Sequence, residues 1–191
     1  FRINQPEEMR AALDYAVQCD GLVSCNHPKP YGPAWDFPSV TNFHCVEVWT
    51  GPWFLFNQQA LEYWLSLLES GSDFHRLAEM DQAIARAPGS PVTWVYVPGK
   101  PDAAGILRAI AAGHVSLSDS PSGPFLDLRA GEETEAMAGD MLPNLPGDTL
   151  PIRIRCLRGA GSHLKILDQQ KVLFERRISQ DDAWVCADLP T

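Results

Sequence analysis

The stretch ILRAIAAGHVSLS, residues 106–118, marks the place where the chain changes from one kind of structure to another. Ile106, Leu107 and Ile110 have the spacing of an amphipathic helix, and Gly113 is a typical residue at a helix end. From His114 onward this helical spacing disappears and short alternating runs begin. We therefore expect two regions, residues 1–113 and 114–191, with a boundary near residues 113–120.

Before this boundary, helical and strand-like stretches alternate. Apolar residues recur at helical spacing within residues 9–17 and 61–68, and the second of these helices should end at Gly71. Strands are predicted at residues 21–25 (GLVSC), 45–49 (CVEVW) and 92–97 (VTWVYV). Strands separated by helices of this length favour an α/β fold with a parallel sheet or barrel.

After the boundary, short strands are broken by Gly, Pro and Asp turns. In the run LPIRIRCL, residues 150–157, Ile152, Ile154 and Cys156 would share one face of a strand, with Arg153 and Arg155 on the other. This pattern is typical of an antiparallel β-sandwich, which we expect for residues 114–191.

Composition limits the classes of partner. The formal charge is −9, with 15 Lys and Arg against 24 Asp and Glu, and no basic run is present, so a nucleic-acid partner is not expected. No apolar run approaches the ~20 residues that span a bilayer, so a membrane partner is not expected either. Assembly as a homo-oligomer stays open.

The chain has five cysteines, an odd number, and no CxxC pair, which argues against a zinc ribbon or a disulfide framework. Most are expected to be buried thiols, with a Cys156–Cys186 bridge as the minor alternative. No signal peptide is visible, which slightly favours the cytoplasm. Because the chain opens on Phe1 rather than Met, a leader or a larger segment could precede it, and the compartment stays open.

The strongest local signal for chemistry is Ser72-Asp73-Phe74-His75. A carboxylate and an imidazole two residues apart on a loop can reach one cation, and this ligand pair suits zinc, manganese or iron. Such a pair also arises by chance, and Ser72 or Asp73 could simply cap the next helix.

A second signal is His27, which follows the predicted strand at residues 21–25. Functional groups gather at the carboxyl ends of parallel strands, so His27 occupies a ligand-like position, although a loop histidine fixed by Pro28 is the plainer interpretation. Glu47 lies inside the next strand and could point into a barrel mouth or toward solvent. His44 is more consistent with a structural role at the start of that strand.

Aromatic residues cluster after these positions and predict an apolar pocket for an organic ester, or a simple seal over the domain. They are Tyr31, Trp35, Phe37, Trp53, Phe54 and Phe56. Lys29 and Arg76 lie next to the proposed ligands and could hold an anionic group.

Taken in order, NHPKPYGPAW (26–35), VEVWTGPW (46–53) and SDFHR (72–76) resemble the later part of a PHP (polymerase and histidinol phosphatase) superfamily metallohydrolase. The closest likeness is to the carbaryl hydrolase-like CehA/McbA branch. TWVYVPG (93–99), AAGHVSLS (111–118) and GPFLDLRAG (123–131) extend this resemblance over nearly the whole chain.

The resemblance implies a partial, distorted PHP-type β/α barrel over residues 1–113, followed by the β-sandwich. His27 matches the His-Pro metal ligand of that family, and Asp73 and His75 match its final Asp-x-His pair, so these three are the implied ligands and the last two the implied catalytic residues. Lys29, Trp35 and Arg76 are the candidate substrate-binding residues.

Two departures from the family pattern stand out. Its opening H-x-H and T-D-H motifs would lie before Phe1, so this chain cannot build the full metal cluster by itself. In addition, Asp73 follows Gly71 by two residues, which leaves no room for the barrel strand expected between that helix and the Asp-x-His pair. We expect this strand to be missing from the sequence at the Gly71–Ser72 junction, and favour unrecorded residues there over a true deletion.

Two functions are therefore weighed. The first is a metal-dependent hydrolase that cleaves a small-molecule phosphoester, carboxylic ester or carbamate with a metal-activated water. The second is a non-catalytic binding or structural protein, in which the barrel is a remnant and the β-sandwich binds a carbohydrate or a protein.

Overall fold

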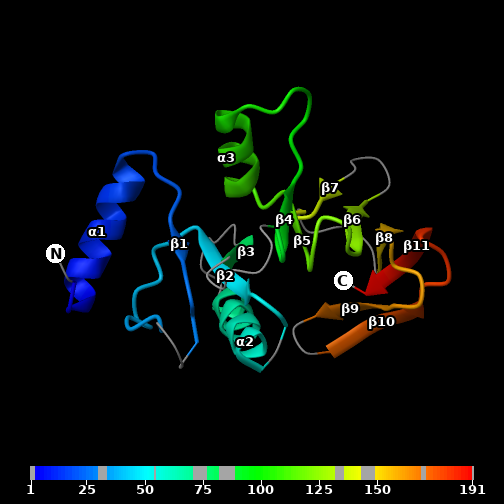
Figure 1. Ribbon diagram of the computed structural model, residues 1–191, viewed down its shortest axis with the longest axis horizontal. Coiled ribbons are helices and arrows are strands. Elements are labelled where there is room, and N and C mark those ends of the chain that lie inside the picture. Colours follow the sequence, from blue (N-terminus) through cyan, green and yellow to red (C-terminus); the bar gives the residue numbers. More distant parts are fainter. Residues whose placement is uncertain are drawn as a thin grey trace.

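The computed structural model describes residues 3–29, 34–53, 55–70, 77–81, 89–131, 136–142, 149–168 and 171–190 of the chain. This part is a mixed α/β structure of three helices and eleven strands in small sheets, without a closed barrel. Figure 1 shows the helices and parallel strands toward the N-terminal side and the long antiparallel strands at the opposite side. None of the described helices is long and apolar enough to cross a membrane.

A parallel sheet forms the first region. Its strands are β1 (Ser24–Cys25), β2 (Cys45–Thr50) and β3 (Leu77–Asp81), in the order β1-β2-β3. Helix α1 (Pro6–Gln18) precedes β1, and helix α2 (Leu55–Glu69) joins β2 to β3. The central strand β2 is almost entirely buried, as its run of apolar residues predicts for a parallel strand covered on both faces.

The core of this region includes Leu67 of α2 together with Val46 and Val48 of β2. Leu13 and Ala16 of α1 pack against its edge. The predicted parallel strands at residues 21–25 and 45–49 are therefore confirmed, although the first is only two residues long.

The third parallel strand begins at Leu77, after the Asp73-x-His75 pair in the sequence. The family pattern places a barrel strand before that pair, and we expected that strand to be missing from this sequence. Leu77 is aligned with Cys45, the first residue of β2. The Gly71–Ser72 junction lies outside the described residues, so its predicted interruption stays a prediction.

The expectation of parallel strands throughout residues 1–113 is wrong for the run at residues 92–97. There, β4 (Val92–Val95) pairs antiparallel with β5 (Val115–Ser118), and α3 (Ala103–Ala111) lies between them in the chain. β4 lies before residue 113 and β5 lies after it, so backbone hydrogen bonds join the two predicted regions. The change in sequence pattern at residue 113 is therefore not a boundary between separate structures. Asp102 caps α3 by accepting a hydrogen bond from the Gly105 amide at 2.6 Å.

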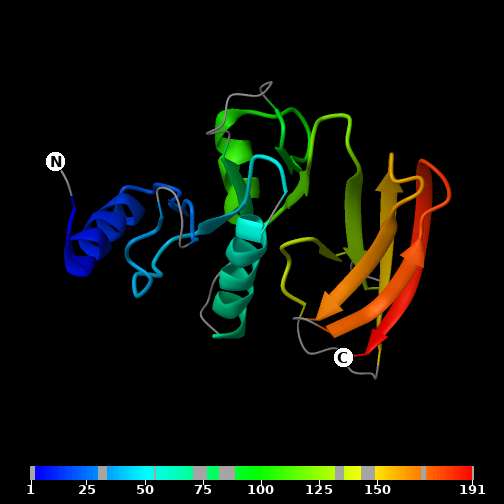
Figure 2. The same ribbon diagram turned by 60° about the horizontal axis from the view of Figure 1, so that its bottom comes forward.

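The second region has the predicted antiparallel strands in two layers, and Figure 2 shows its long strands at the right of the view. One layer is a four-stranded sheet of order β11-β8-β6-β7 and the other is the β9–β10 pair. The strands are β6 (Phe125–Ala130), β7 (Ala136–Met137), β8 (Thr149–Leu157), β9 (His163–Asp168), β10 (Lys171–Arg177) and β11 (Asp182–Pro190).

The predicted alternation along β8 is confirmed. Ile152, Ile154 and Cys156 are buried, and they pack with Leu164 of β9 and Val185 of β11 in a single apolar cluster between the layers. This shared cluster holds the sandwich together.

The Cys156–Cys186 bridge does not form, because all five cysteines are free thiols. Cys156 faces the core and Cys186, which is aligned with Arg153 on β8, is exposed. Burial, with the negative charge of Glu47 as a second cause, raises the pKa of the Cys25 thiol to about 12, and burial also raises the pKa of Cys156.

This arrangement predicts a pattern of thiol reactivity. Iodoacetamide should modify exposed Cys19 and Cys186 in the native protein and leave Cys25, Cys45 and Cys156 unmodified, because the reagent cannot reach buried thiols. Mass spectrometry of peptides, with the urea-unfolded protein as the fully reactive control, checks this outcome. Native-state labelling of Cys156 at the rate of Cys186 would contradict the buried core.

Candidate functional site

The carboxylate of Glu47 lies at the centre of the candidate site. It is the only charged side chain of β2 and is 1% exposed. Its Oε2 accepts a hydrogen bond from the backbone amide of His27 at 2.7 Å, and its Oε1 accepts one from the Thr50 hydroxyl. A buried carboxylate is tolerated only when such partners satisfy it, so Glu47 joins the ends of two neighbouring strands.

His27 organises the loop that follows β1. Its imidazole Nε2 lies 3.4 Å from Oε2 of Glu47, and its side chain is 16% exposed. Its carbonyl accepts hydrogen bonds from the amides of Lys29 at 2.7 Å and Trp35 at 2.9 Å. The backbone of His27 has a φ of +53°, a left-handed conformation that costs a non-glycine residue about 1 kcal/mol or more. Such a conformation persists only where surrounding contacts enforce it, and it is typical of functional sites.

The loop after β2 is fixed by buried Asn57 of α2. Its Oδ1 accepts a hydrogen bond from the Thr50 amide at 3.0 Å, and its Nδ2 donates one to the Pro52 carbonyl at 3.1 Å. These bonds hold Thr50 against Glu47. His44, in contrast, has a structural role: its Nδ1 accepts a hydrogen bond from the Val23 amide at 3.1 Å, which ties the start of β2 to β1.

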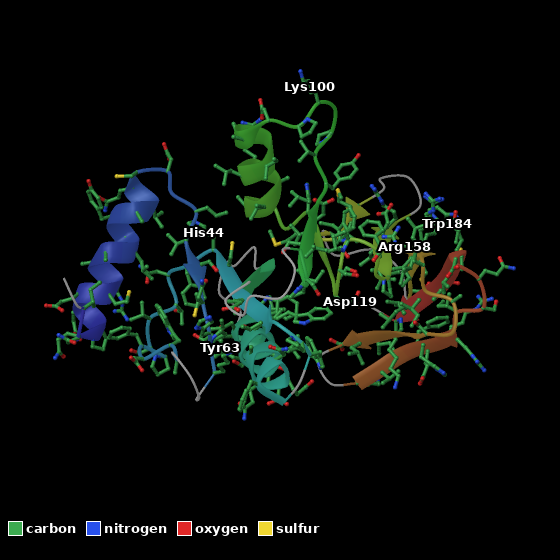
Figure 3. All side chains as sticks on the ribbon, viewed as in Figure 1. His44, Tyr63, Lys100, Asp119, Arg158 and Trp184 are labelled. Atoms are coloured by element: carbon green, nitrogen blue, oxygen red, sulfur yellow. The ribbon has the colours of Figure 1, made fainter. Side chains whose placement is uncertain are left out.

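A hollow of about 360 Å³ lies beside the His27 loop. Its lining consists of Pro28, Lys29, Ala34, Trp35, Asp36, Pro38 and Tyr63. The ring of Trp35 packs edge-on against Phe37 and Phe43, with centroid separations of 5.8 and 6.1 Å. Among the described residues that line it, the hollow thus has an apolar wall, the cation of Lys29 and the carboxylate of Asp36. In Figure 3, Tyr63 and His44 are both on the side of the molecule formed by β1, β2 and α2.

Of the six residues assigned a site role in the sequence, the structure brings together three: His27, Lys29 and Trp35. Asp73, His75 and Arg76 lie outside the described residues, as do Tyr31 and Phe54, so their predicted roles stay predictions. Within the described part of the chain, no group of three or more His, Cys, Asp or Glu side chains is placed to hold a metal ion.

Sequence reasoning left the orientation of Glu47 open and did not single out Thr50 or Asn57. A signal for Glu47 was present, because a lone carboxylate inside the run CVEVWT interrupts an otherwise buried pattern. Thr50 and Asn57 gave no such signal, since their contribution depends on partners that only the folded loop brings near.

Comparisons with known proteins add no assignment: no family model, no curated protein and no solved structure matches this chain.

Proposed function

We propose that this chain is part of a metal-dependent hydrolase of PHP type. His27 and Glu47 would lie at one side of its metal site, and β1–β3 would form part of its barrel. The observation that carries this proposal is the buried carboxylate of Glu47 beside the imidazole of His27, at the adjoining ends of two parallel strands. The resemblance of the NHP, VEVW and SDFHR motifs to that superfamily supports the same assignment.

The geometry of the pair fits a zinc-like ion. Two ligand atoms bound at about 2.1 Å by a tetrahedral ion lie about 3.4 Å apart. His27 Nε2 and Glu47 Oε2 have this separation, at 3.4 Å. The pair would supply two ligands, and Asp73 and His75 are the candidates for the others. Zinc, manganese and iron all accept this mixture of nitrogen and oxygen donors.

When bound, the metal would supply an activated water and polarise the ester bond. The chain's own residues have separate tasks. Glu47 fixes the His27 loop through the His27 amide, which orients the imidazole. Lys29 can hold an anionic phosphate or carboxylate in the adjoining hollow, and Trp35 can cover an apolar part of the substrate.

Metal binding by histidine variants tests the proposal. His27→Ala should weaken zinc binding at least about tenfold, because a lost ligand removes much of the affinity of a metal site. His163→Ala is the matched control, since His163 lies exposed on β9 beside Glu175. Equilibrium dialysis with zinc or manganese gives both affinities.

Hydrolysis of 4-nitrophenyl phosphate and 4-nitrophenyl acetate by the metal-loaded full-length protein then separates phosphoester from carboxylic ester chemistry, since this chain alone is expected to be inactive. Equal metal affinity of the two histidine variants would overturn the role of His27. No metal binding by the full-length protein would favour the non-catalytic alternative.

A further inference from the structure

Strand β11 forms a long edge of the sandwich. Among the described strands it pairs with β8 alone, and in Figure 2 it is the red strand at the right of the view. It has nine residues, and its ladder with β8 contains no bulge. An edge strand of this length presents a row of backbone N–H and C=O groups that can pair with a strand of another chain.

The backbone groups at this edge belong to the even-numbered residues of β11. Immediately before the strand, the Arg158 amide donates a hydrogen bond to the Asp181 carbonyl at 2.5 Å. Hydrogen-bonded pairs alternate along an antiparallel ladder, so the odd-numbered residues of β11 bond to β8. Four residues therefore direct both an N–H and a C=O to the edge: Asp182, Trp184, Cys186 and Asp188.

The other layer of the sandwich has protected edges, whereas β11 does not. Folded proteins keep strand edges apart with lysines, prolines and bulges. Strands β9 and β10 carry Lys165 and Lys171, and the register of their ladder shifts between Val172 and Phe174. β11 has no lysine or arginine, and its proline, Pro190, is its last residue. The edge of β11 is therefore suited to a partner strand.

The two faces of β11 would both gain from such a partner. Val185 is buried in the sandwich core, and three further side chains lie half-buried at the margin of that core: Ala183, Ala187 and Leu189. On the opposite face, Trp184 is 54% exposed and Asp182 is bonded to Arg155 at 2.8 Å. An added strand would extend the core on one face and cover part of Trp184 on the other.

A second copy of β11 fits the apolar face of this edge. When two copies pair antiparallel about Cys186, Val185 lies opposite Ala187 of the second copy, and Ala183 lies opposite Leu189. Each larger apolar side chain thus meets a smaller one across the new ladder. A shift of the register by one residue would turn the apolar face of the added strand outward.

The same register keeps like charges from lying directly opposite each other. Trp184 lies opposite Asp188 of the second copy. Asp182 lies opposite Pro190, whose missing N–H falls at the end of the new ladder. Pairing centred on Val185 would instead set Asp182 opposite Asp188, and like charges in that position are destabilising. The sequence of β11 therefore favours the first register.

We propose that two copies of the protein pair antiparallel through β11 and join their four-stranded sheets into one continuous sheet, with Cys186 at the twofold axis. Pairing of a surface with its own copy about such an axis is closed, so it gives a dimer and not a fibre. Figure 3 shows Trp184 of β11 on the opposite side of the molecule from His44. The dimer uses no residue of the His27 loop, so this proposal and the proposed function can fail separately.

Disulfide formation tests the register, because each Cys186 would face its own copy. The Cα atoms of a hydrogen-bonded antiparallel pair lie about 5.5 Å apart, within the range of disulfides. Oxidation of the full-length protein with copper phenanthroline should therefore give a covalent dimer on a non-reducing gel. Cys186→Ser should abolish this dimer. Cys19→Ser, which removes the other exposed thiol of this chain, should leave it unchanged.

A proline at the edge tests the backbone pairing. Asp188→Pro removes an N–H that points to the edge and leaves the bonds to β8 in place, so the variant should fold. It should raise the dissociation constant of the dimer at least about tenfold, because each dimer loses two backbone hydrogen bonds. Asp188→Ala keeps the N–H and is the matched control. Circular dichroism checks folding, and analytical ultracentrifugation of the full-length protein gives the dissociation constants.

Cys186→Lys covers the case in which Asp188→Pro fails to fold. It sets two ammonium groups opposite each other at the axis and should also weaken the dimer, whereas Cys186→Ser should not. The proposal is overturned if the full-length protein stays monomeric at hundreds of micromolar, or if the covalent dimer persists in Cys186→Ser. Equal dissociation constants for folded Asp188→Pro and Asp188→Ala would overturn it as well.

Discussion

Replacement of Glu47 by alanine is expected to lower the free energy of unfolding by about 3 kcal/mol. The change leaves two donors, the His27 amide and the Thr50 hydroxyl, without the acceptor that Glu47 provides. Each orphaned buried donor costs about 1–3 kcal/mol. The variant no longer buries a charge, which offsets part of this loss and keeps the estimate in the lower half of the summed range of about 2–6 kcal/mol.

Urea unfolding followed by circular dichroism measures the change, with Glu62→Ala as the matched control. Glu62 lies on the exposed face of α2, where its Oε1 accepts a hydrogen bond from Gln58. Its replacement should alter stability by less than about 0.5 kcal/mol. Similar losses in both variants would mean that Glu47 contributes little to the fold, and that the His27 loop is held by other contacts.

The isosteric Glu47→Gln variant separates the shape of the site from its charge. Glutamine fills the same space and keeps one acceptor oxygen, so a loss of about 1–2 kcal/mol is expected, less than for alanine. If Glu47 is a metal ligand, this variant should still lose most of its affinity for zinc, because a neutral amide is a much poorer ligand than a carboxylate. Stability and metal affinity then change by different amounts, which a purely structural role would not produce.

The sandwich was the part of the fold most open to prediction. Along β8, Arg153 and Arg155 alternate with Ile152, Ile154 and Cys156, so the buried face can be read directly from the residues. The parallel strand β2 was also predictable, because its continuous apolar run is typical of a strand covered on both faces.

The direction of β4 was not predictable, because local pattern carries no information about strand direction. A run such as VTWVYV fits a parallel or an antiparallel neighbour equally well. The segment between β4 and β5 is long enough, with α3 in it, for a parallel crossover. β5 nevertheless runs antiparallel to β4. This direction is set by the long-range packing of β5 and not by the local sequence.

The candidate site was predictable in position but not in composition. The rule that functional groups follow the carboxyl ends of parallel strands led to His27 and its neighbours, Lys29 and Trp35. The orientation of the Glu47 side chain could not be predicted, since the local sequence of a strand is similar whether its glutamate faces solvent or the core. Its orientation depends on the His27 amide, twenty residues away in the chain.

Replacement of Gly139 by alanine is expected to be the most damaging single-methyl change in the described part of the chain. A Cβ at this position would lie 2.3 Å from the Gly113 carbonyl carbon and 2.6 Å from the Ala112 carbonyl oxygen. These are backbone atoms, which cannot rotate away as a side chain can. The φ of Gly139 is +96°, which adds the cost of a left-handed conformation, about 1–2 kcal/mol. A total loss of about 4 kcal/mol is expected.

Gly161→Ala isolates the conformational part of this cost. Gly161 has a φ of +86°, close to that of Gly139, but a Cβ there would meet no atom within 4 Å. Urea unfolding should therefore show a loss of only about 1–2 kcal/mol for Gly161→Ala. The difference between the two variants measures the close approach of Gly113 to Gly139. Equal losses of stability in the two variants would show that the backbones around residues 113 and 139 separate at little cost.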